Sequence, residues 1–130
     1  MSNVLELRNI HKVFNAGTVD EAVIFNDFNF TVDEGAFISI IGSNGSGKTT
    51  LLNLICGSDT VNGGKVLFDD RDITNLPEYK RASFIGRVFQ NPQMGTCPDL
   101  TIIENMALAD NKGGCFGLLP AVNKKRIDYY

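Results

Sequence analysis

The sequence predicts a mixed α/β fold, in which antiparallel strands lie beside a core built on a strand, a glycine-rich loop and a helix. Residues 5–8 and 28–33 each alternate apolar with polar side chains, which is typical of half-buried strands. Residues 36–41 form a short, nearly continuous apolar run, which suits a strand buried on both faces of a mostly parallel sheet. A glycine-rich loop at residues 42–49 follows this run, and a helical pattern follows the loop. This order of elements is the one that a phosphate-binding loop requires.

Local signals predict the remaining elements. Apolar residues follow a helical period across residues 48–56, and Gly57 then ends the helix. Thr101 and Glu104 have the spacing of a capping box, which predicts a helix over residues 101–109. Further elements are predicted as strands at residues 65–68 and 84–89, a short helix that begins at residues 75–78, and a turn at residues 34–35.

Composition and charge exclude several classes of protein. Of the 130 residues, 43% are hydrophobic and 21% are charged, which indicates a globular protein with a real core. The net charge is -3, whereas a nucleic-acid binder usually carries an excess of basic residues. Three cysteines, an odd number without CxxC spacing, fit a reducing compartment. With no apolar run long enough to span a bilayer and no signal peptide at the start, we expect a cytosolic protein whose membrane connection comes through a partner.

Residues 42–49 read GSNGSGKT and match the phosphate-loop pattern G-x-x-x-x-G-K-[ST] in full. Glycines let the backbone curl so that successive N–H groups point inward, and the following helix adds its free N–H groups and the positive end of its dipole. Lys48 is expected to reach the β- and γ-phosphates, the Thr49 hydroxyl to ligate Mg²⁺, and Thr50 to donate to the α-phosphate. The alternative is a glycine-rich turn that binds nothing. The residues expected to bind the nucleotide here are Gly42, Ser43, Asn44, Gly45, Ser46, Gly47, Lys48, Thr49 and Thr50.

Three other features have a structural rather than a chemical interpretation. Residues 66–70 look like an apolar strand that ends in acids, but Asp69 and Asp70 are expected to form a hairpin turn. His11, the only histidine, is expected to face solvent or to pack. Cys56 continues the apolar stripe of the predicted helix and is expected in the core.

Taken together, four segments resemble ATP-binding proteins of the ABC transporter family. Residues 42–52 (GSNGSGKTTLL) resemble the Walker A segment of the family, and residues 5–14 (LELRNIHKVF) resemble its opening strand. Residues 32–35 (VDEG) resemble the turn before its nucleotide-binding strand, and residues 88–92 (VFQNP) resemble its glutamine loop. The resemblance extends from about Val4 to Ala109 and implies a P-loop nucleoside triphosphate hydrolase fold of ABC type, present in part, with an N-terminal antiparallel β region.

The resemblance also implies roles for two further residues. Phe14 matches the aromatic residue that stacks on adenine, although a lone aromatic residue near a strand end is more often part of the core. Gln90 matches the residue that senses Mg²⁺ and the attacking water, and its loop contacts the membrane subunit in the family; the alternative is an exposed polar group in a loop. The expected catalytic residues are therefore Lys48 and Gln90, and the expected contacts of Mg²⁺ are Thr49 and Gln90.

Several parts of the family's machinery have no match. The signature Leu-Ser-Gly-Gly-Gln, the later apolar strand that ends in Asp-Glu and the switch histidine are absent. We therefore expect residues 1–130 to be the N-terminal part of the family's ATP-binding domain, with an incomplete central parallel sheet that exposes edges and apolar faces. Because in-line attack on the γ-phosphate needs a positioned base and charge stabilisation from two sides, we expect the chain alone to hydrolyse ATP very slowly or not at all.

The resemblance implies ATP and Mg²⁺ as cofactors, transmembrane permease subunits and a second ATP-binding subunit as partners, and a position on the inner face of the cell membrane. Within the family, residues 100–105 and 113–119 resemble importers or exporters of small solutes that have a separate permease, with systems for aromatic amino acids as one example. Two other hypotheses remain: a binding module that holds ATP without hydrolysing it, or regulates a permease, and a soluble ABC protein that acts on nucleic acid or ribosomes. The acidic charge balance argues against the last.

Overall fold

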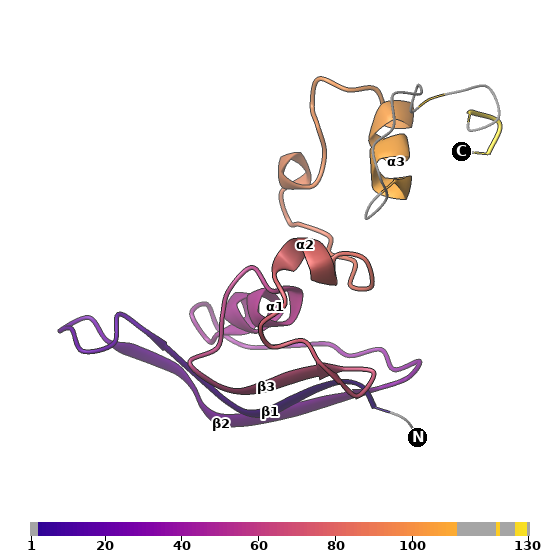
Figure 1. Ribbon diagram of the computed structural model, residues 1–130. Helices are drawn as coiled ribbons and strands as arrows, with labels where there is room; N and C mark the ends of the chain where they lie inside the picture. The colour runs from indigo at the N-terminus through magenta and orange to yellow at the C-terminus, as the bar shows by residue number, and fades with distance from the viewer. Residues whose placement is uncertain (1–2, 112–121, 123–126, 130) are drawn as a thin grey trace. The chain divides into compact units, whose positions relative to one another are not determined.

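The structure, a computed structural model, describes residues 3–111, 122 and 127–129. It divides into two compact units, residues 1–81 and 82–130, and each is described by itself. The first unit contains a sheet with helices α1 and α2, and the second contains a short 3₁₀ helix and helix α3 (Figure 1). Cys115 and residues 113–119, to which the sequence drew attention, lie outside the described residues.

The sheet of the first unit has four strands, all antiparallel to their neighbours, in the order β2-β1-β3-β4. This confirms the predicted N-terminal antiparallel region. The strands predicted at residues 5–8, 28–33 and 65–68 are present, and each is longer than its pattern indicated. The bounds are β1 at Asn3–Phe14, β2 at Ala22–Asp33, β3 at Gly63–Phe68 and β4 at Arg71–Asp72.

An irregularity in the β1–β2 ladder explains why the sequence pattern missed half of β2. The register shifts between Leu7 and Ile10, where Asn9 has a positive φ angle of 49°, and again between Ile10 and Lys12, where Asp27 on β2 has a φ angle of 55°. The Asn9 N–H donates to Asn29 Oδ1 at 2.8 Å, and Asn9 Nδ2 donates to Asp27 Oδ1 at 2.6 Å. An extra residue of this kind interrupts the two-residue alternation, so the strand extends back beyond the part that alternates.

Helix α1 (Lys48–Cys56) has the predicted bounds and lies over one face of the sheet (Figure 1). Gly57 ends it in the left-handed conformation, with its N–H donating to Asn53 O at 2.9 Å, as a C-terminal glycine is expected to do. Cys56 is buried, as predicted, and His11 is exposed on β1. The buried apolar side chains of this unit are Leu5, Leu7, Ile10, Leu51, Leu54, Cys56, Val66 and Ile73.

Asp69 and Asp70 form the tight turn between β3 and β4, with φ angles of 50° and 59°. Two central residues at positive φ are the signature of the hairpin turn that matches the twist of its strands, and aspartate tolerates this conformation. The predicted turn is therefore confirmed.

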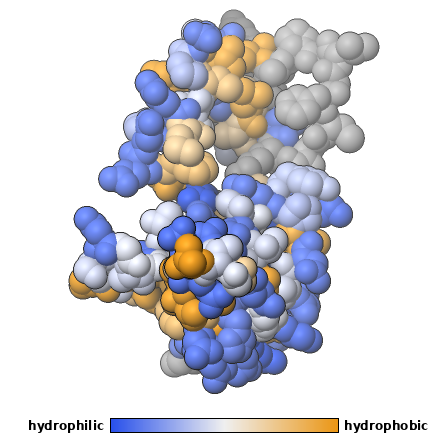
Figure 2. All heavy atoms as spheres, turned by 90° about the vertical axis from the view of Figure 1, so that its left-hand side faces the viewer, coloured by the Kyte–Doolittle hydropathy of each residue, from blue (hydrophilic) through white to orange (hydrophobic). Residues whose placement is uncertain are grey.

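The strands predicted at residues 36–41 and 84–89 are wrong. Within the described residues, neither segment is hydrogen-bonded to a neighbouring strand. Phe37 and Ile41 are each 94% exposed and Val88 is 98% exposed. Hydrophobic groups of this kind can be seen at the surface in orange (Figure 2). An apolar run indicates that a segment could be buried between neighbouring strands, but it does not show that such strands are present. A strand of a parallel sheet pairs only with strands that are distant in the sequence.

Arg81, the last residue of helix α2 (Glu78–Arg81), holds the C-terminal end of α1. It is only 2% exposed, and its guanidinium donates to four backbone carbonyls, those of Leu54, Ile55, Thr74 and Leu76, at 2.7 to 2.9 Å. Carbonyls in the last turn of a helix have no intrahelical donor, so Arg81 satisfies two groups that α1 cannot. Burial lowers the pKa of this guanidinium from its ordinary value because desolvation penalises the charged form.

Replacing Arg81 with methionine is expected to lower the free energy of unfolding by about 3 kcal/mol, because buried carbonyls without a donor cost ~1–3 kcal/mol each. Urea unfolding followed by circular dichroism measures the loss. The control is Arg71→Met on exposed β4, where we expect a change below about 0.5 kcal/mol. Equal effects of the two substitutions would contradict a structural role for Arg81.

The second unit begins its regular structure with a 3₁₀ helix, η1 (Pro92–Met94), and continues to α3 (Ile102–Asp110). Thr101 and Glu104 form the predicted capping box: the Glu104 N–H donates to Thr101 Oγ1 at 3.3 Å, and the Thr101 N–H donates to Glu104 Oε2 at 2.8 Å. In the described part of the chain, no helix has both the length and the apolar character to cross a membrane.

The capping box makes a prediction about titration. The Thr101 hydroxyl and then its backbone N–H hold the pKa of Glu104 below its ordinary value of 4.5. Because the pKa of Glu104 is lower in the folded state than in the unfolded state, its ionised carboxylate stabilises the fold at pH values above the ordinary pKa. This stabilisation is lost as the pH falls through the lowered pKa of the folded state. In a carbon-detected NMR titration, Thr101→Ala should move the Glu104 pKa up towards 4.5, whereas Thr101→Ser, which keeps the hydroxyl, should not. An unchanged pKa in Thr101→Ala would contradict the assignment.

Candidate functional site: a phosphate loop at the start of helix α1

The backbone of residues 42–49 forms a compact loop that leads directly into α1. The Ser46 N–H donates to Ser43 O at 3.2 Å, and Gly45 and Gly47 have φ angles of 83° and 88°. Gly47 is the N-terminal cap, and the first helical bond runs from the Leu51 N–H to Gly47 O at 2.8 Å. The N–H groups of the first helical turn have no intrahelical acceptor, and they carry the positive end of the helix dipole. The loop and the helix therefore offer donors to an anion at one place.

Lys48 folds back over this loop. Its Nζ donates to Gly42 O at 2.7 Å and to Ser43 O at 2.6 Å, and lies 3.4 Å from Ser46 Oγ. The side chain thus holds a positive charge at the loop while its partners are neutral oxygens. Within the described residues, no carboxylate forms an ion pair with Lys48. An ammonium without a carboxylate partner is free to exchange carbonyl contacts for an anionic ligand.

Close packing surrounds two glycines of the loop. A Cβ on Gly42 would lie 2.6 Å from Ser46 Oγ, and a Cβ on Gly47 would lie 2.9 Å from Ile24 Cγ2 and 3.2 Å from Phe25 Cζ. Gly47 combines this contact with its positive φ angle, so its place between the loop and β2 admits no side chain. The loop is seated directly on strand β2, which fixes where α1 begins.

Thr49 and Thr50 lie in the first turn of α1, and Thr49 is exposed. Their hydroxyls are neutral oxygen donors next to the loop amides. Among the described residues there is no cluster of three or more histidine, cysteine or acidic side chains that could hold a metal ion. Mg²⁺ usually keeps several waters and binds through few protein oxygens together with substrate phosphates, so a single threonine hydroxyl at this place fits that ion.

Phe14 ends β1, where it pairs with Ala22 of β2. Its side chain is 37% exposed, and Lys12 Nζ lies 4.6 Å from the centre of its ring. Lys12 in turn pairs across the ladder with Phe25, the residue whose ring contacts Gly47. The aromatic residue predicted to bind a base and the loop predicted to bind phosphates thus lie at the same end of the β1–β2 hairpin.

Gln90 is exposed and belongs to the second unit, so it is described separately from the loop. It lies between Phe89, whose ring is 4.6 Å from the Arg87 guanidinium, and Asn91, whose side chain caps η1 by accepting from the Gln93 N–H at 3.0 Å. The predicted roles of Gln90 in metal sensing and catalysis stay predictions.

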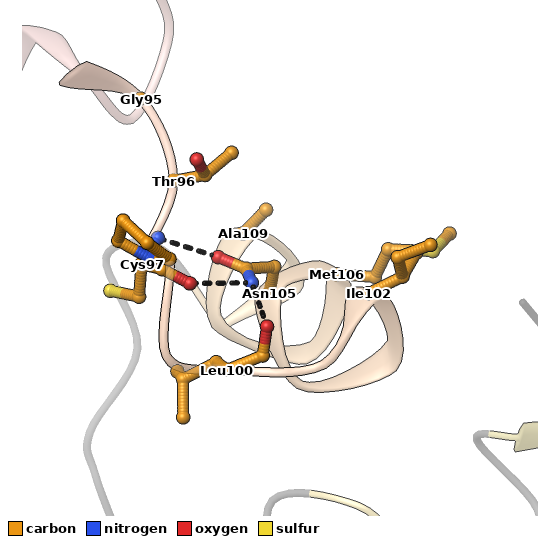
Figure 3. Close-up of a pocket in the computed structure, with 9 residues that line it drawn as sticks. Gly95, Thr96, Cys97, Leu100, Ile102, Asn105, Met106 and Ala109 are labelled. Atoms are coloured by element: carbon orange, nitrogen blue, oxygen red, sulfur yellow. Dashed lines mark hydrogen bonds between the residues drawn. The ribbon is translucent and has the colours of Figure 1, made fainter. Parts of the chain in front are cut away.

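A pocket of about 490 Å³ follows the Gln90 loop in the same unit (Figure 3). Asn105 fixes its wall: the Cys97 N–H donates to Asn105 Oδ1 at 2.8 Å, and Asn105 Nδ2 donates to the carbonyls of Cys97 and Leu100, both at 3.1 Å. Met106 and Ile102 add exposed apolar surface. The pocket is therefore mostly apolar, with polar groups that are already used to hold its own backbone.

Sequence reasoning missed the residues that support the loop. Ile24 and Phe25 were not included in a strand, although the apolar run at residues 23–25 was a signal for one. Lys12 was missed as well, although its spacing of two from Phe14 puts both side chains on one face of a strand.

The G-x-x-x-x-G-K-[ST] motif at residues 42–49, closed as a loop onto the start of a helix, defines the P-loop class of α/β proteins. Within this class, the chain belongs to the ABC transporter family, whose model matches residues 25–128.

Curated relatives agree with this assignment. The tyrosine transport ATP-binding protein of Clostridioides difficile is 43% identical over 122 residues, which are 94% of this chain and 49% of the relative. The spermidine/putrescine import ATP-binding protein of Haemophilus influenzae is 41% identical over 104 residues, 80% of this chain and 26% of that protein. The chain thus spans about half of the first relative and about a quarter of the second.

Solved structures lead to the same family. The dimeric bacterial ABC transporter cassette MJ0796 matches with a TM-score of 0.75 and 31% identity, over 95% of this chain and 53% of that one. The ADP conformation of MJ1267, an ATP-binding cassette of an ABC transporter, matches with a TM-score of 0.72 and 30% identity, over all of this chain and 46% of that one. The P-loop fold of ABC type is thereby confirmed.

Proposed function

We propose that residues 42–50 bind the phosphates of ATP, and that the chain serves as the nucleotide-binding part of an ATP-binding subunit that powers transport of a solute across a membrane. The observation that carries this proposal is the loop at the start of α1, with the Lys48 ammonium held against it at 2.6–2.7 Å from two carbonyls. Membership in the ABC transporter family supports it, as do relatives that are named as ATP-binding proteins of transport systems.

In this proposal, backbone N–H groups of residues 43–48 donate to the β- and γ-phosphates, and Lys48 exchanges its carbonyl contacts for phosphate oxygens. Thr50 donates to the α-phosphate. Thr49 holds Mg²⁺, which would neutralise charge on the β- and γ-phosphates when bound. Phe14 stacks on the adenine, and Gln90 senses the metal and the attacking water. A structure of MJ0796 with ADP and phosphate bound, in a dimeric post-hydrolysis state, supports nucleotide binding by a cassette of this fold.

The proposed partners are a second ATP-binding subunit and transmembrane permease subunits. The dimeric cassette structures support the first. The apolar pocket that follows the Gln90 loop, lined in part by the exposed side chains of Ile102 and Met106, supports a contact with an apolar segment of a permease. The protein would then work in the cytoplasm, on the inner face of the membrane. The tyrosine transport relative supports an aromatic amino acid as the solute.

Binding and turnover assays on the intact chain test the function. We expect ATP and ADP to bind and AMP to bind far more weakly, since the loop addresses the β- and γ-phosphates. We expect little or no phosphate release by the chain alone. Rapid release that disappears in Lys48→Ala would contradict the expectation that catalysis needs further parts. Equal binding of AMP and ATP would contradict the phosphate role of the loop.

A further inference from the structure

Lys12 is a charged residue that the fold buries next to Phe14. Lys12 is only 6% exposed, although it lies on a strand near the end of the hairpin. Its ammonium donates to Asp59 Oδ1 at 2.6 Å and to the Thr60 carbonyl at 2.7 Å, and it lies 4.6 Å from the centre of the Phe14 ring. A lysine is rarely buried unless it is paired, so these contacts fix the position of the charge.

The ammonium in turn fixes the ring. A cation near an aromatic face is attracted by the negative potential of that face. Phe14 is followed by residues 15–21, all of them exposed, so the Lys12 contact restrains a side chain at the edge of the sheet. A ring that is held in one orientation loses less conformational freedom when a flat ligand stacks on it.

The same lysine joins the ring to the helix that carries the phosphate loop. Asp59 and Thr60 lie two and three residues after Gly57, the C-terminal cap of α1, and α1 begins at the loop. The connection between α1 and β3 is also held to β1 without Lys12: the Val13 N–H donates to Asn62 Oδ1 at 2.8 Å, and the Asn62 N–H donates to His11 O at 2.9 Å. A neutral side chain at position 12 should therefore leave this connection in place.

We propose that Lys12 is a positioning residue for recognition of the nucleotide base: it holds Phe14 where a purine can stack while the triphosphate occupies the loop. This rests on the proposed function, because it assumes that residues 42–50 bind the phosphates. It predicts that Lys12 acts on binding of the base and not on binding of the phosphates.

Isothermal titration of the intact chain with ATP and with inorganic tripolyphosphate separates the two contributions. Lys12→Met keeps the length of the side chain, and it should lower ATP affinity by roughly tenfold. This loss is a part of the binding free energy that one base–aromatic stack contributes. Tripolyphosphate affinity should stay at the wild-type value. Lys12→Arg should restore the preference for ATP over tripolyphosphate, and Phe14→Leu should reproduce the loss. Equal losses for both ligands, or no loss for ATP, would overturn the proposal.

A second measurement does not depend on affinity. The chain contains no tryptophan, so Phe14→Trp introduces a single fluorescent reporter at the ring position. Adding Lys12→Met to this variant should lower the fluorescence anisotropy of the indole, and unchanged anisotropy would contradict restraint by Lys12. Wild-type chain that binds neither ATP nor tripolyphosphate would refute the proposed function and this inference with it. Wild-type chain that binds both ligands equally would refute the stacking role of Phe14 and this inference, and would leave the phosphate role of the loop standing.

Discussion

Replacing Lys48 with alanine is expected to weaken ATP binding by roughly 100-fold. Hydrogen bonds to charged groups contribute ~1.5–3 kcal/mol each, and about 1.4 kcal/mol corresponds to a tenfold change in affinity. The ammonium lies over the loop, 2.7 Å from Gly42 O and 2.6 Å from Ser43 O, so it needs little movement to meet phosphate oxygens. Isothermal titration with ATP in the presence of Mg²⁺ measures the loss.

Lys65→Ala is the matched control for this substitution. Lys65 is an exposed lysine on β3 whose only ion pair among the described residues is a 3.7 Å contact with Asp72. Its removal should leave ATP affinity unchanged, because a single exposed ion pair contributes little. If Lys48→Ala bound ATP as tightly as Lys65→Ala, the ammonium would have no part in binding phosphate.

Gly47→Ala is expected to lower the free energy of unfolding by about 3 kcal/mol and to abolish most ATP binding. Left-handed backbone costs a residue with a Cβ roughly 1–2 kcal/mol, and overpacking adds ~1–3 kcal/mol. Both terms apply here, because φ is 88° and the new Cβ would lie 2.9 Å from Ile24 Cγ2. The loop would have to leave β2 and move its amides with it. Urea unfolding and ATP titration measure the two effects.

Two further variants separate the causes. Gly45 has a similar φ of 83° but nothing within 4 Å of an added Cβ, so Gly45→Ala should cost only the backbone term, about 1 kcal/mol. Ile24→Ala removes the atom that Gly47→Ala would meet, so in that background the substitution should cost less. Equal costs for Gly45→Ala and Gly47→Ala would show that the contact with β2 has no influence.

Elements with strong local signals could be predicted from sequence. Helix α1 has the predicted bounds because Gly47 and Gly57 fix its two ends through their own backbone conformations. The capping box of α3 and the turn at Asp69–Asp70 are equally local, since each depends on residues at most three apart. The phosphate loop belongs to this group, which is why its place was found without any tertiary information.

Elements that depend on distant partners could not be predicted in this way. Residues 36–41 have the composition of a buried strand, but a strand is defined by its neighbours, and the described residues give it none. The first half of β2 was missed because the positive φ of Asp27 interrupts the alternation. The contacts of Lys12 with Asp59 and of Gly47 with Ile24 join residues more than twenty positions apart, and no local pattern encodes them.

The most direct test is to observe the loop amides themselves while polyphosphate is added. In nitrogen–proton correlation spectra of the intact chain, tripolyphosphate at millimolar concentration should shift the amide signals of residues 43–50, with Gly45, Gly47 and Lys48 among the largest. The amides of Asp69 and Asp70, in the turn between β3 and β4, should stay in place. Unmoved signals across residues 43–50, in a chain whose α1 signals show a folded helix, would contradict the account.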